Sequence, residues 1–570
     1  MAAASTTTAA KAAASPTTAA AKTAATPPVA TEEQLSKEFK EYSVAEFFKR
    51  NRQMLGYSGK VRSLTTIVHE LVTNSLDSTE EAGILPEITV EVQELPDGHV
   101  KIIAEDNGTG VPKKNVGQAF GKLLAGTKFH QRKQKRGQQG IGVSYAVLFS
   151  QLTTGKITHV KTGIGDHKAY ECDISIDVKS NMPVIINEKE YSQKYRGVKI
   201  EFEFAEVTYN RSEYSVYEYL RRTALANPHA QITLIEPNKE VVVFPRAVKE
   251  IPAKPRAIQP HPLGIATSDL IEMAHASTAR KIASFLTSEF SRFSSDKVKE
   301  ISALIPDVNM DRAPRALTWP EAEKIINTIQ KVKWIAPETD AMIPIGEAHI
   351  EKSLKNLLQP EQMKVIERKP KVFKGGIPFL VEAAIAYGGK AGTIVGGQKK
   401  AEVLRFANRT PLLFDAGSCA TMEAVKNIDW NRYDLKNWEE QPISIFINLV
   451  SVYVPYTGAG KMAISPEEEI VQEIRNAIME CARDISVYLH ALQKAEEQEQ
   501  RRQIFFKYIG EVAEALHDVT GKPQKELEEK LRKIAEKKTA LLEAMDGKDE
   551  NDKELEEMEE AAEKEIQEEG

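Results

Sequence analysis

The stretch from residue 61 to residue 79 combines a broad apolar face with three polar side chains that share one direction. At about 100° per residue, the apolar positions cover one side of a predicted helix. They are Val61, Leu64, Ile67, Val68, Leu71, Val72 and Leu76. Glu70, Asn74 and Asp77 fall within a narrow arc on the other side. Such a stripe is either a solvated face or the lining of a cleft, and the helix alone leaves both interpretations open.

Alternating apolar and polar positions predict a sheet after this helix. The predicted strands are residues 88–95, 99–106, 158–164, 167–176, 197–207 and 230–237. Pro96, Asp97 and Gly98 are typical of a turn between the first two strands. Because helical patterns alternate with these strands, we expect an α+β layer in which helices cover one face of a mixed sheet.

The pattern changes twice further along the chain. Short helical patterns run from residue 267 to 332 after a Pro-rich segment, and strands return at 371–389, 401–414 and 443–457 before a long helical pattern from 465 to 516. The Ala- and Thr-rich start of the chain cannot bury a core. We therefore expect an α+β multidomain chain. Its parts are a disordered tail at 1–31, an α+β domain at 32–255, a helical domain at 256–335, a third domain with a helical stalk at 336–515, and a charged helical extension with an acidic tail at 516–570.

Composition narrows the class of protein. Lys and Arg total 76 against 82 Asp and Glu, so any contact with nucleic acid must come from local basic patches. The cysteines, Cys172, Cys419 and Cys481, are far apart and predict free thiols without a zinc site. No apolar run in the sequence approaches the roughly 20 residues that span a bilayer. We expect a soluble protein of the cytoplasm or nucleoid, with no membrane contact.

Two glycine-containing motifs follow the predicted helix. Asp106, Gly108 and Gly110 stand in "DNGTG" at the end of a predicted strand, where a carboxylate can accept a hydrogen bond from an exocyclic amine. Alone, this motif is also a common turn. The second motif, "RGQQGIG", opens an apolar helical run, and a glycine-rich loop at a helix N-terminus is typical of a phosphate site. Each motif alone is ambiguous.

The order and spacing of the three motifs resemble the nucleotide-binding boxes of the GHKL ATPase superfamily, which has the Bergerat fold, an α/β sandwich. The resemblance implies that Glu70 is the general base that orients the attacking water, that Asn74 holds Mg²⁺ against the triphosphate of ATP, and that Asp106 binds the adenine amine. Gly108 and Gly110 then let the backbone approach the base. Asp77 supports the adenine or the water shell of Mg²⁺. The lid over the phosphates consists of Gly137, Gln138, Gln139, Gly140, Ile141 and Gly142.

Longer strings resemble one family within this superfamily, the B subunits of topoisomerase VI, a type IIB DNA topoisomerase of archaea and plants. They include "SVAEFFKRNRQMLGY", "HELVTNSLDS", "MIPIGEAHIEKSLK", "LRFANRTPLLFDAGSCA" and "VPYTGAGKMAI". The resemblance covers residues 40 to 510. It implies a helix-two-turns-helix insert, a transducer βαβ domain, dimerisation of two copies on ATP binding, and a heterotetramer with A subunits that carry the tyrosine that cleaves duplex DNA. The implied activity is ATP-dependent double-strand passage.

Lys461 in "YTGAGKMAI" resembles the switch-loop lysine that the transducer sends to the γ-phosphate. A surface lysine is the alternative interpretation. A phosphate-binding P-loop is not, because that motif requires Gly at the position of Pro455 and Ser or Thr at that of Met462. Three basic clusters are candidate DNA contacts or ordinary solvated faces. They are Lys128, His130, Arg132, Lys133, Lys135 and Arg136; Arg368, Lys369, Lys371 and Lys374; and Lys399, Lys400, Arg405 and Arg409.

Two other functions remain open at this point. A repair clamp similar to MutL shares the ATPase and transducer but lacks the helical insert. A chaperone of the same superfamily would prevent client aggregation without DNA or an A subunit.

Overall fold

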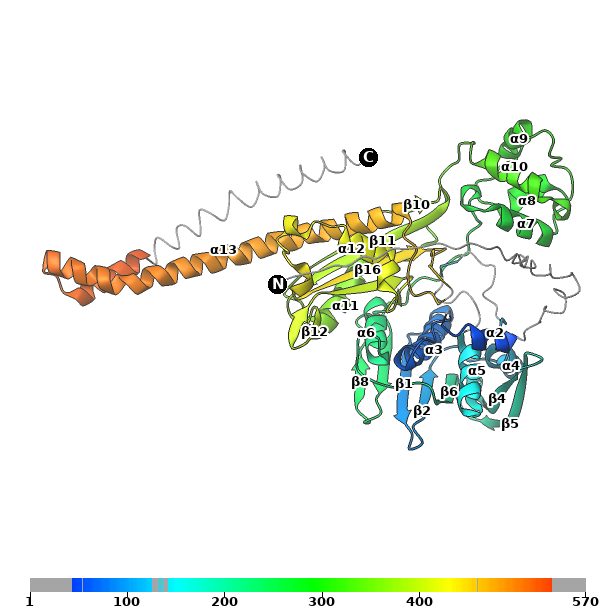
Figure 1. The fold of residues 1–570 in the computed structure, drawn as a ribbon, viewed down its shortest axis with the longest axis horizontal. Coiled ribbons are helices and arrows are strands. Elements are labelled where there is room, and N and C mark those ends of the chain that lie inside the picture. The colour runs from blue at the N-terminus through cyan, green and yellow to red at the C-terminus, as the bar shows by residue number, and fades with distance from the viewer. Residues whose placement is uncertain are drawn as a thin grey trace, which may run out of the picture.

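The computed structural model describes residues 44–53, 55–125, 133, 134, 136, 142–458 and 460–535. Figure 1 shows two sheet-containing layers one above the other, a separate cluster of helices, and one long helix that projects away from the body. The predicted tail at residues 1–31 and the acidic end of the predicted extension lie outside the described residues.

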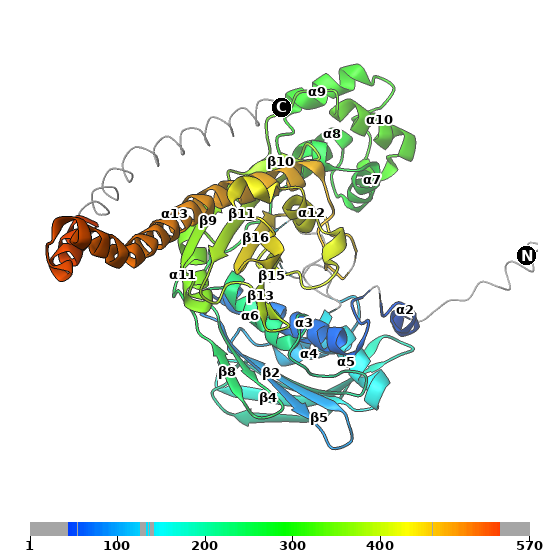
Figure 2. The same cartoon turned by 60° about the vertical axis from the view of Figure 1, so that its left-hand side comes forward.

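The lower layer is an eight-stranded sheet with helices on one face (Figure 2). Its strands, in the order β5-β4-β3-β6-β2-β1-β7-β8, are β1 (Glu87–Glu94), β2 (Val100–Asp106), β3 (Thr158–Ile164), β4 (Lys168–Asp177), β5 (Met182–Ser192), β6 (Arg196–Phe204), β7 (Gln231–Ile235) and β8 (Val241–Phe244). β1 pairs parallel with β7 and antiparallel with β2, so the sheet is mixed, as predicted.

Helices cover one face of this sheet because alternate strand residues are apolar. Ile88, Val90 and Val92 of β1 are buried, while the residues between them are partly exposed. The covering helices are α3 (Lys60–Ala82), α4 (Lys113–Gly121), α5 (Gly142–Thr154) and α6 (Val216–Ala226), with α2 (Val44–Arg50) preceding them. The helix predicted over residues 61–79 is thus present as α3.

A small helical cluster follows the Pro-rich segment. It contains α7 (Thr267–Ala276), α8 (Ile282–Glu289), α9 (Ser295–Leu304) and α10 (Trp319–Ile329) around an apolar core of its own. The short helices expected from residue 267 onward are therefore confirmed. The exact domain boundaries stay predictions.

The upper layer is a six-stranded sheet. Its strands are β9 (Gln362–Glu367), β10 (Lys371–Phe373), β11 (Ile377–Tyr387), β14 (Glu402–Ala407), β15 (Thr410–Pro411) and β16 (Ile443–Ser451), and a separate hairpin joins β12 (Thr393–Val395) to β13 (Gln398–Lys400). Ten of the eleven β11 residues are buried, because α11 (Glu347–Leu358) covers one face while α12 (Ala420–Lys426) and α13 (Glu468–Thr520) cover the other. This double cover explains the continuous apolar run in the sequence.

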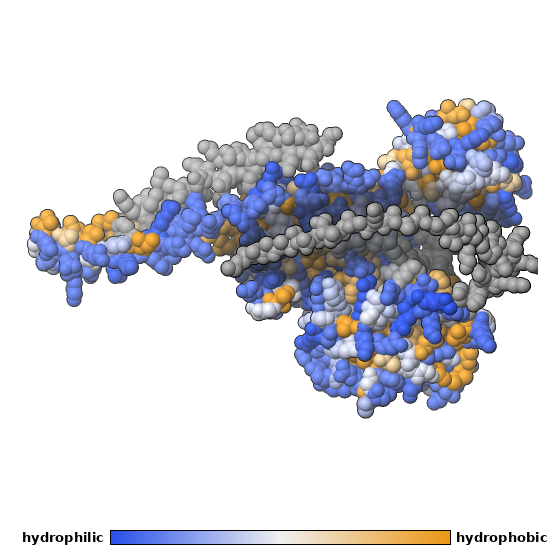
Figure 3. All heavy atoms as spheres, in the orientation of Figure 1, coloured by the Kyte–Doolittle hydropathy of each residue, from blue (hydrophilic) through white to orange (hydrophobic). Residues whose placement is uncertain are grey.

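α13 extends 53 residues and ends where Gly521 adopts a left-handed conformation, with φ 69°. Residues 524–535 then form a helix that folds back on α13, since Leu531 lines an apolar groove together with Ile504 and Tyr508. Apolar residues gather at this far end of the molecule (Figure 3). The charged helical extension predicted from residue 516 therefore starts with the last residues of α13 and continues as the second arm of a helical hairpin.

Candidate functional site

α3 carries the polar stripe next to the sheet. It begins after Gly59 and ends at Gly83, whose left-handed conformation lets its N–H bond the last helical carbonyls. Its apolar face is buried in the core of the lower layer, whereas Asn74 is exposed and Glu70 and Asp77 are partly buried. The stripe therefore faces away from the core and lines a surface that other elements approach.

The first residue of α5 lies directly against Glu70. A Cβ atom added to Gly142 would stand 1.7 Å from Glu70 Oε2, so no other residue fits there without movement of the carboxylate. Because the N-terminus of a helix carries partial positive charge, α5 also presents a favourable environment for negative charge beside Glu70. The last glycine of the second motif and the first residue of the polar stripe thus meet in the fold.

Lys461 approaches the same place from the upper layer. Its Nζ donates a hydrogen bond to the backbone carbonyl of Arg136, at 3.5 Å. The neighbouring Met462 lies against Gly56, where an added Cβ atom would stand 2.8 Å from Met462 Cε. Burial lowers the pKa of His69, and the positive charge of Lys461 lowers it further while Glu70 opposes the shift. Lys461 therefore lies within electrostatic range of the His69–Glu70 turn of α3.

Asp106 ends β2 and is held by three donors. Its Oδ1 accepts from the backbone N–H of Gly108 at 2.8 Å and of Val198 at 3.3 Å, and its Oδ2 accepts from Ser75 Oγ at 2.8 Å. Burial raises the pKa of Asp106, and these hydrogen bonds oppose the shift. The carboxylate is thus oriented by α3, by β6 and by the loop that follows β2, with acceptor capacity left on Oδ2 for one more donor.

The two glycines after Asp106 are required by their surroundings. A Cβ at Gly108 would stand 2.5 Å from Ser78 Oγ, and a Cβ at Gly110 would stand 2.1 Å from the Gly163 carbonyl oxygen. Gly110 also has φ 68°, a conformation that glycine adopts without strain. The backbone can therefore pass close to α3 at Gly108 and close to β3 at Gly110 only with glycine at these positions.

Asp77 has a partner that the sequence did not suggest. Its Oδ1 accepts from Arg136 Nη1 at 3.1 Å, and Arg136 is buried. A role of Asp77 toward a nucleotide stays a prediction. The other predicted site residues, Gly137, Gln138, Gln139, Gly140 and Ile141, lie outside the described residues.

Two site residues were missed by the sequence analysis, Ser75 and Ser78. Ser75 bonds Asp106, and Ser78 Oγ accepts from the Thr109 N–H at 3.0 Å. The only indication in the sequence was that they directly follow Asn74 and Asp77 in the predicted helix. The direction of a serine hydroxyl depends on tertiary contacts and cannot be read from periodicity.

The candidate DNA contacts divide into buried and exposed residues. Arg136, Arg405 and Arg409 are buried, and Arg405 Nη2 donates to the Phe414 carbonyl at 2.9 Å, so their assignment as surface contacts for DNA was wrong. Arg368, Lys371 and Lys374 pair with acidic residues at the start of α13. Lys399 is exposed on the β12–β13 hairpin. Lys128, His130, Arg132 and Lys135 lie outside the described residues.

Neither a metal cluster nor a membrane span is found in the part of the chain that the structure describes. No group of three or more His, Cys, Asp or Glu side chains there could hold a metal ion. None of the described helices is long and apolar enough to cross a membrane. The three cysteines are free and buried.

Similarity to known proteins covers both layers. A family model described as "Histidine kinase-, DNA gyrase B-, and HSP90-like ATPase" matches residues 59–205, and one described as "Topoisomerase VI B subunit, transducer" matches residues 337–501. The B subunit of type 2 DNA topoisomerase 6 from Pyrococcus furiosus is 44% identical over 560 residues, covering 90% of this chain and 97% of that protein. The same protein from Methanothermobacter thermautotrophicus is 47% identical over 474 residues, covering 83% and 90%. Among solved structures, the ATPase region of Saccharomyces cerevisiae topoisomerase II shares 12% identity and covers 80% of this chain and 99% of its own, with a TM-score of 0.38.

Proposed function

The chain belongs to the family of topoisomerase VI B subunits, and we propose that it hydrolyses ATP at α3 to drive the passage of one DNA duplex through another. It is the ATPase subunit of a type II DNA topoisomerase. The cleaving tyrosine belongs to a partner A subunit, with which this chain forms a heterotetramer. The helical insert from α7 to α10, which follows the lower layer and precedes the upper layer in the sequence, argues against a MutL-like clamp.

The contact between Gly142 and Glu70 carries this proposal. Phosphoryl transfer to water needs little covalent help and depends on positioning and on neutralisation of charge. The N-terminus of α5 supplies partial positive charge within contact distance of a carboxylate that can orient water. Glu70 is thus the general base, and the adjacent helix terminus favours a phosphate.

Asn74 would hold Mg²⁺. This ion takes oxygen ligands, keeps several waters and uses few protein ligands when phosphates complete its shell. The exposed side-chain oxygen of Asn74, one turn from Glu70, fits that requirement without an acidic cluster. When bound, the ion would neutralise negative charge on the triphosphate.

Asp106 would recognise the adenine. Its Oδ2 accepts one hydrogen bond from Ser75 and retains capacity for an exocyclic amine. Gly108 and Gly110 keep the backbone clear of side chains beside it. The same carboxylate would discriminate against guanine, which presents a carbonyl oxygen at that position.

Lys461 would report the state of the nucleotide to the upper layer, the transducer. A lysine suits this role because its ammonium is a point charge on a flexible stem. ATP binding would dimerise two copies through their ATPase domains around a DNA segment, and α13 would carry the change to the A subunit. Exposed lysines such as Lys369 and Lys399 would contact the DNA backbone, so binding should weaken steeply with salt.

Relaxation of supercoiled DNA tests this function. The chain is assayed with ATP, alone and with its A subunit, at several salt concentrations. Relaxation that requires both subunits and ATP is the expected result. Relaxation by this chain alone would overturn the division between subunits, and prevention of client aggregation without any relaxation would favour the chaperone.

A further inference from the structure

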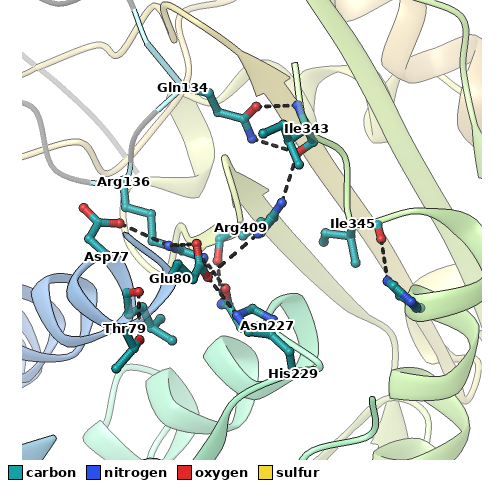
Figure 4. Close-up of polar contacts among 12 residues, drawn as sticks. Asp77, Thr79, Glu80, Gln134, Arg136, Asn227, His229, Ile343, Ile345 and Arg409 are labelled. Carbon is teal, nitrogen blue, oxygen red and sulfur yellow. Dashed lines mark hydrogen bonds and ion pairs between the residues drawn. The ribbon is translucent and has the colours of Figure 1, made fainter. Parts of the chain in front are cut away.

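A buried cluster of polar and charged residues joins α3 to the upper layer beside Lys461 (Figure 4). Arg136 is its centre. The Arg136 guanidinium donates to Glu80 at 2.6 and 3.0 Å and to Asp77 at 3.1 Å. Both carboxylates lie on α3, in the turns that follow Asn74. The side chain of Arg136 is only 6% exposed, so these interactions are largely shielded from water.

The cluster continues into the upper layer through Asn227 and Arg409. Arg136 Nη2 donates to Asn227 Oδ1 at 2.6 Å, and Asn227 Nδ2 donates to the Arg409 carbonyl at 3.1 Å. Arg409 Nη2 donates to the Ile343 carbonyl at 3.2 Å, while its Nη1 lies 3.8 Å from Glu80 Oε1. A continuous path of polar contacts thus runs from α3 to the β14–β15 turn.

Gln134 forms a second attachment beside this path. Its Nε2 donates to the Ile343 carbonyl at 2.9 Å, and its Oε1 accepts from the Ile343 N–H at 2.6 Å. Both hydrogen bonds of the amide are therefore made to one backbone unit of the segment that leads into α11. Gln134 is 5% exposed and carries no charge. Replacing it therefore removes two directional hydrogen bonds without leaving a buried charge unpaired.

The cluster meets the upper layer at a tight turn and leaves two buried donor atoms unpaired within the described part of the chain. Arg409 has φ 66°, in the left-handed region that side chains other than glycine rarely adopt, and Asn408 before it has φ 47°. The Nε atoms of Arg136 and Arg409 are buried without a hydrogen-bond partner among the described residues. Buried donors are normally paired, so these two guanidinium groups are incompletely satisfied parts of the cluster.

We propose that Gln134 and Arg136 are positioning residues that transmit nucleotide occupancy from α3 to the Ile343 segment and the Arg409 turn of the transducer. This connection works in parallel with Lys461 and rests on the proposed function. The two routes meet at Arg136, because its carbonyl accepts the Lys461 ammonium while its guanidinium holds α3 and Asn227. A ligand at Asn74 would bias the cluster through the next two turns of the same helix.

Hydrogen exchange of the full chain tests the connection. Wild type, Gln134→Ala, Lys461→Ala and the control Gln193→Ala are compared with and without a non-hydrolysable ATP analogue and Mg²⁺. Gln193 is exposed and accepts a hydrogen bond from Lys161, so its replacement removes an amide that lies far from the transducer. In wild type, nucleotide should alter exchange at residues 341–346, 407–411 and 456–463.

Each variant should lose one part of that response. Gln134→Ala should lose the change at 341–346 and 407–411 and keep that at 456–463, whereas Lys461→Ala should show the reverse. A wild-type response at 341–346 and 407–411 in Gln134→Ala would overturn the inference. If wild type itself showed no nucleotide response at any segment, the proposed function would fail, and the inference would fail with it.

Coupling to strand passage gives a second measurement. With the A subunit present, strand passages per ATP should fall about fivefold in Gln134→Ala, within the usual range for residues that modulate coupling. The KM for ATP should match that of Gln193→Ala. Arg409→Lys retains the positive charge but loses the planar guanidinium, and it should lower strand passages per ATP as Gln134→Ala does. This variant replaces Gln134→Ala in the experiment if Gln134→Ala folds poorly. Equal passages per ATP in these variants and the control would contradict the inference.

Discussion

Arg221 of α6 donates a hydrogen bond to Glu402 of β14, with 2.6 Å between Arg221 Nη2 and Glu402 Oε2. The pair joins the two sheet-containing layers, and Glu402 is 5% exposed. Glu402 Oε1 also accepts from Ser444 Oγ, so both carboxylate oxygens are occupied. The contact fixes the position of the transducer sheet relative to the ATPase helices.

Removing this carboxylate should destabilise the joint between the layers. Glu402→Ala removes a carboxylate that accepts from Arg221 and Ser444, while Arg221 keeps its ion pair with Glu218. Loss of a hydrogen bond to a charged group costs about 1.5–3 kcal/mol. We expect a clearly lower Tm in calorimetry. Glu206→Ala is the matched control, because it breaks a more exposed pair with Arg52 that contributes less than about 1 kcal/mol. Equal effects in the two variants would contradict this account.

Glu70→Ala should abolish most ATP hydrolysis. Loss of a general base typically costs about 10²- to 10⁴-fold in rate. Nucleotide binding should persist, since Asp106 and the glycines that flank it are unchanged. The measurement is steady-state phosphate release together with binding of a fluorescent ATP analogue. A normal hydrolysis rate in this variant would remove Glu70 from its assigned role.

Lys461→Ala should lose strand passage even where nucleotide still binds. Its ammonium contacts the Arg136 carbonyl from the upper layer, so its loss removes a link between the layers while the ATPase residues remain. Supercoil relaxation with the A subunit, alongside nucleotide binding, checks this. Lys426→Ala, an exposed transducer lysine, is the control and should relax DNA normally. Full relaxation by Lys461→Ala would rule out the switch role.

Gly110→Ala should be more harmful than Gly98→Ala. Both glycines have positive φ, at 68° and 80°, and that conformation alone costs another residue about 1–2 kcal/mol. Gly98 has open space around it, whereas a Cβ at Gly110 would stand 2.1 Å from the Gly163 carbonyl oxygen. Tm values and ATP affinities of the two variants compare these costs. Equal Tm values and ATP affinities in the two variants would show that the backbone at Gly110 moves away from β3 without a measurable cost.

Acidification should destabilise the chain through His229. Burial lowers the pKa of His229 from 6.5, although its hydrogen bond to Glu80 opposes the shift. The folded chain therefore binds fewer protons than the unfolded chain, so stability is complete above the unfolded pKa and is lost as pH falls through the folded pKa. Between about pH 7.5 and about pH 5.5, which bracket the ordinary histidine pKa, the Tm of wild type should fall by more than the Tm of His229→Gln. The exposed His275→Gln should follow wild type.

Strong periodicity predicted the elements with one buried face. β3 was predicted at residues 158–164, and the structure has it at Thr158–Ile164. β5 was missed because it is an edge strand whose residues are all at least partly exposed, which leaves no alternation to detect. The turn at Asn408 and Arg409 was also missed, since both have positive φ without a glycine to indicate it.

The site was predicted as far as it lies on one helix and one strand end. Helical spacing placed Glu70 and Asn74 on one face of a helix, and alternation placed Asp106 at a strand end, as the structure has them. Their roles toward a nucleotide came from the family resemblance and stay predictions. The Arg136–Glu80–Arg409 cluster did not, because its members are spread over residues 80 to 409 and meet only in the folded chain. A basic stretch in a sequence also looks the same whether its arginines face water or are buried against carboxylates.

The length of α13 sets the scale of motion available to a partner at its far end. With 53 residues, the helix is about 80 Å long at 1.5 Å per residue. Its first half packs on the transducer sheet and its second half projects beyond it (Figure 1). A rotation of about 10° at the base of such a rod moves its tip by about 14 Å. A small rotation at the transducer end of α13 would therefore become a displacement of many ångströms at the tip, where a partner that binds this end would lie.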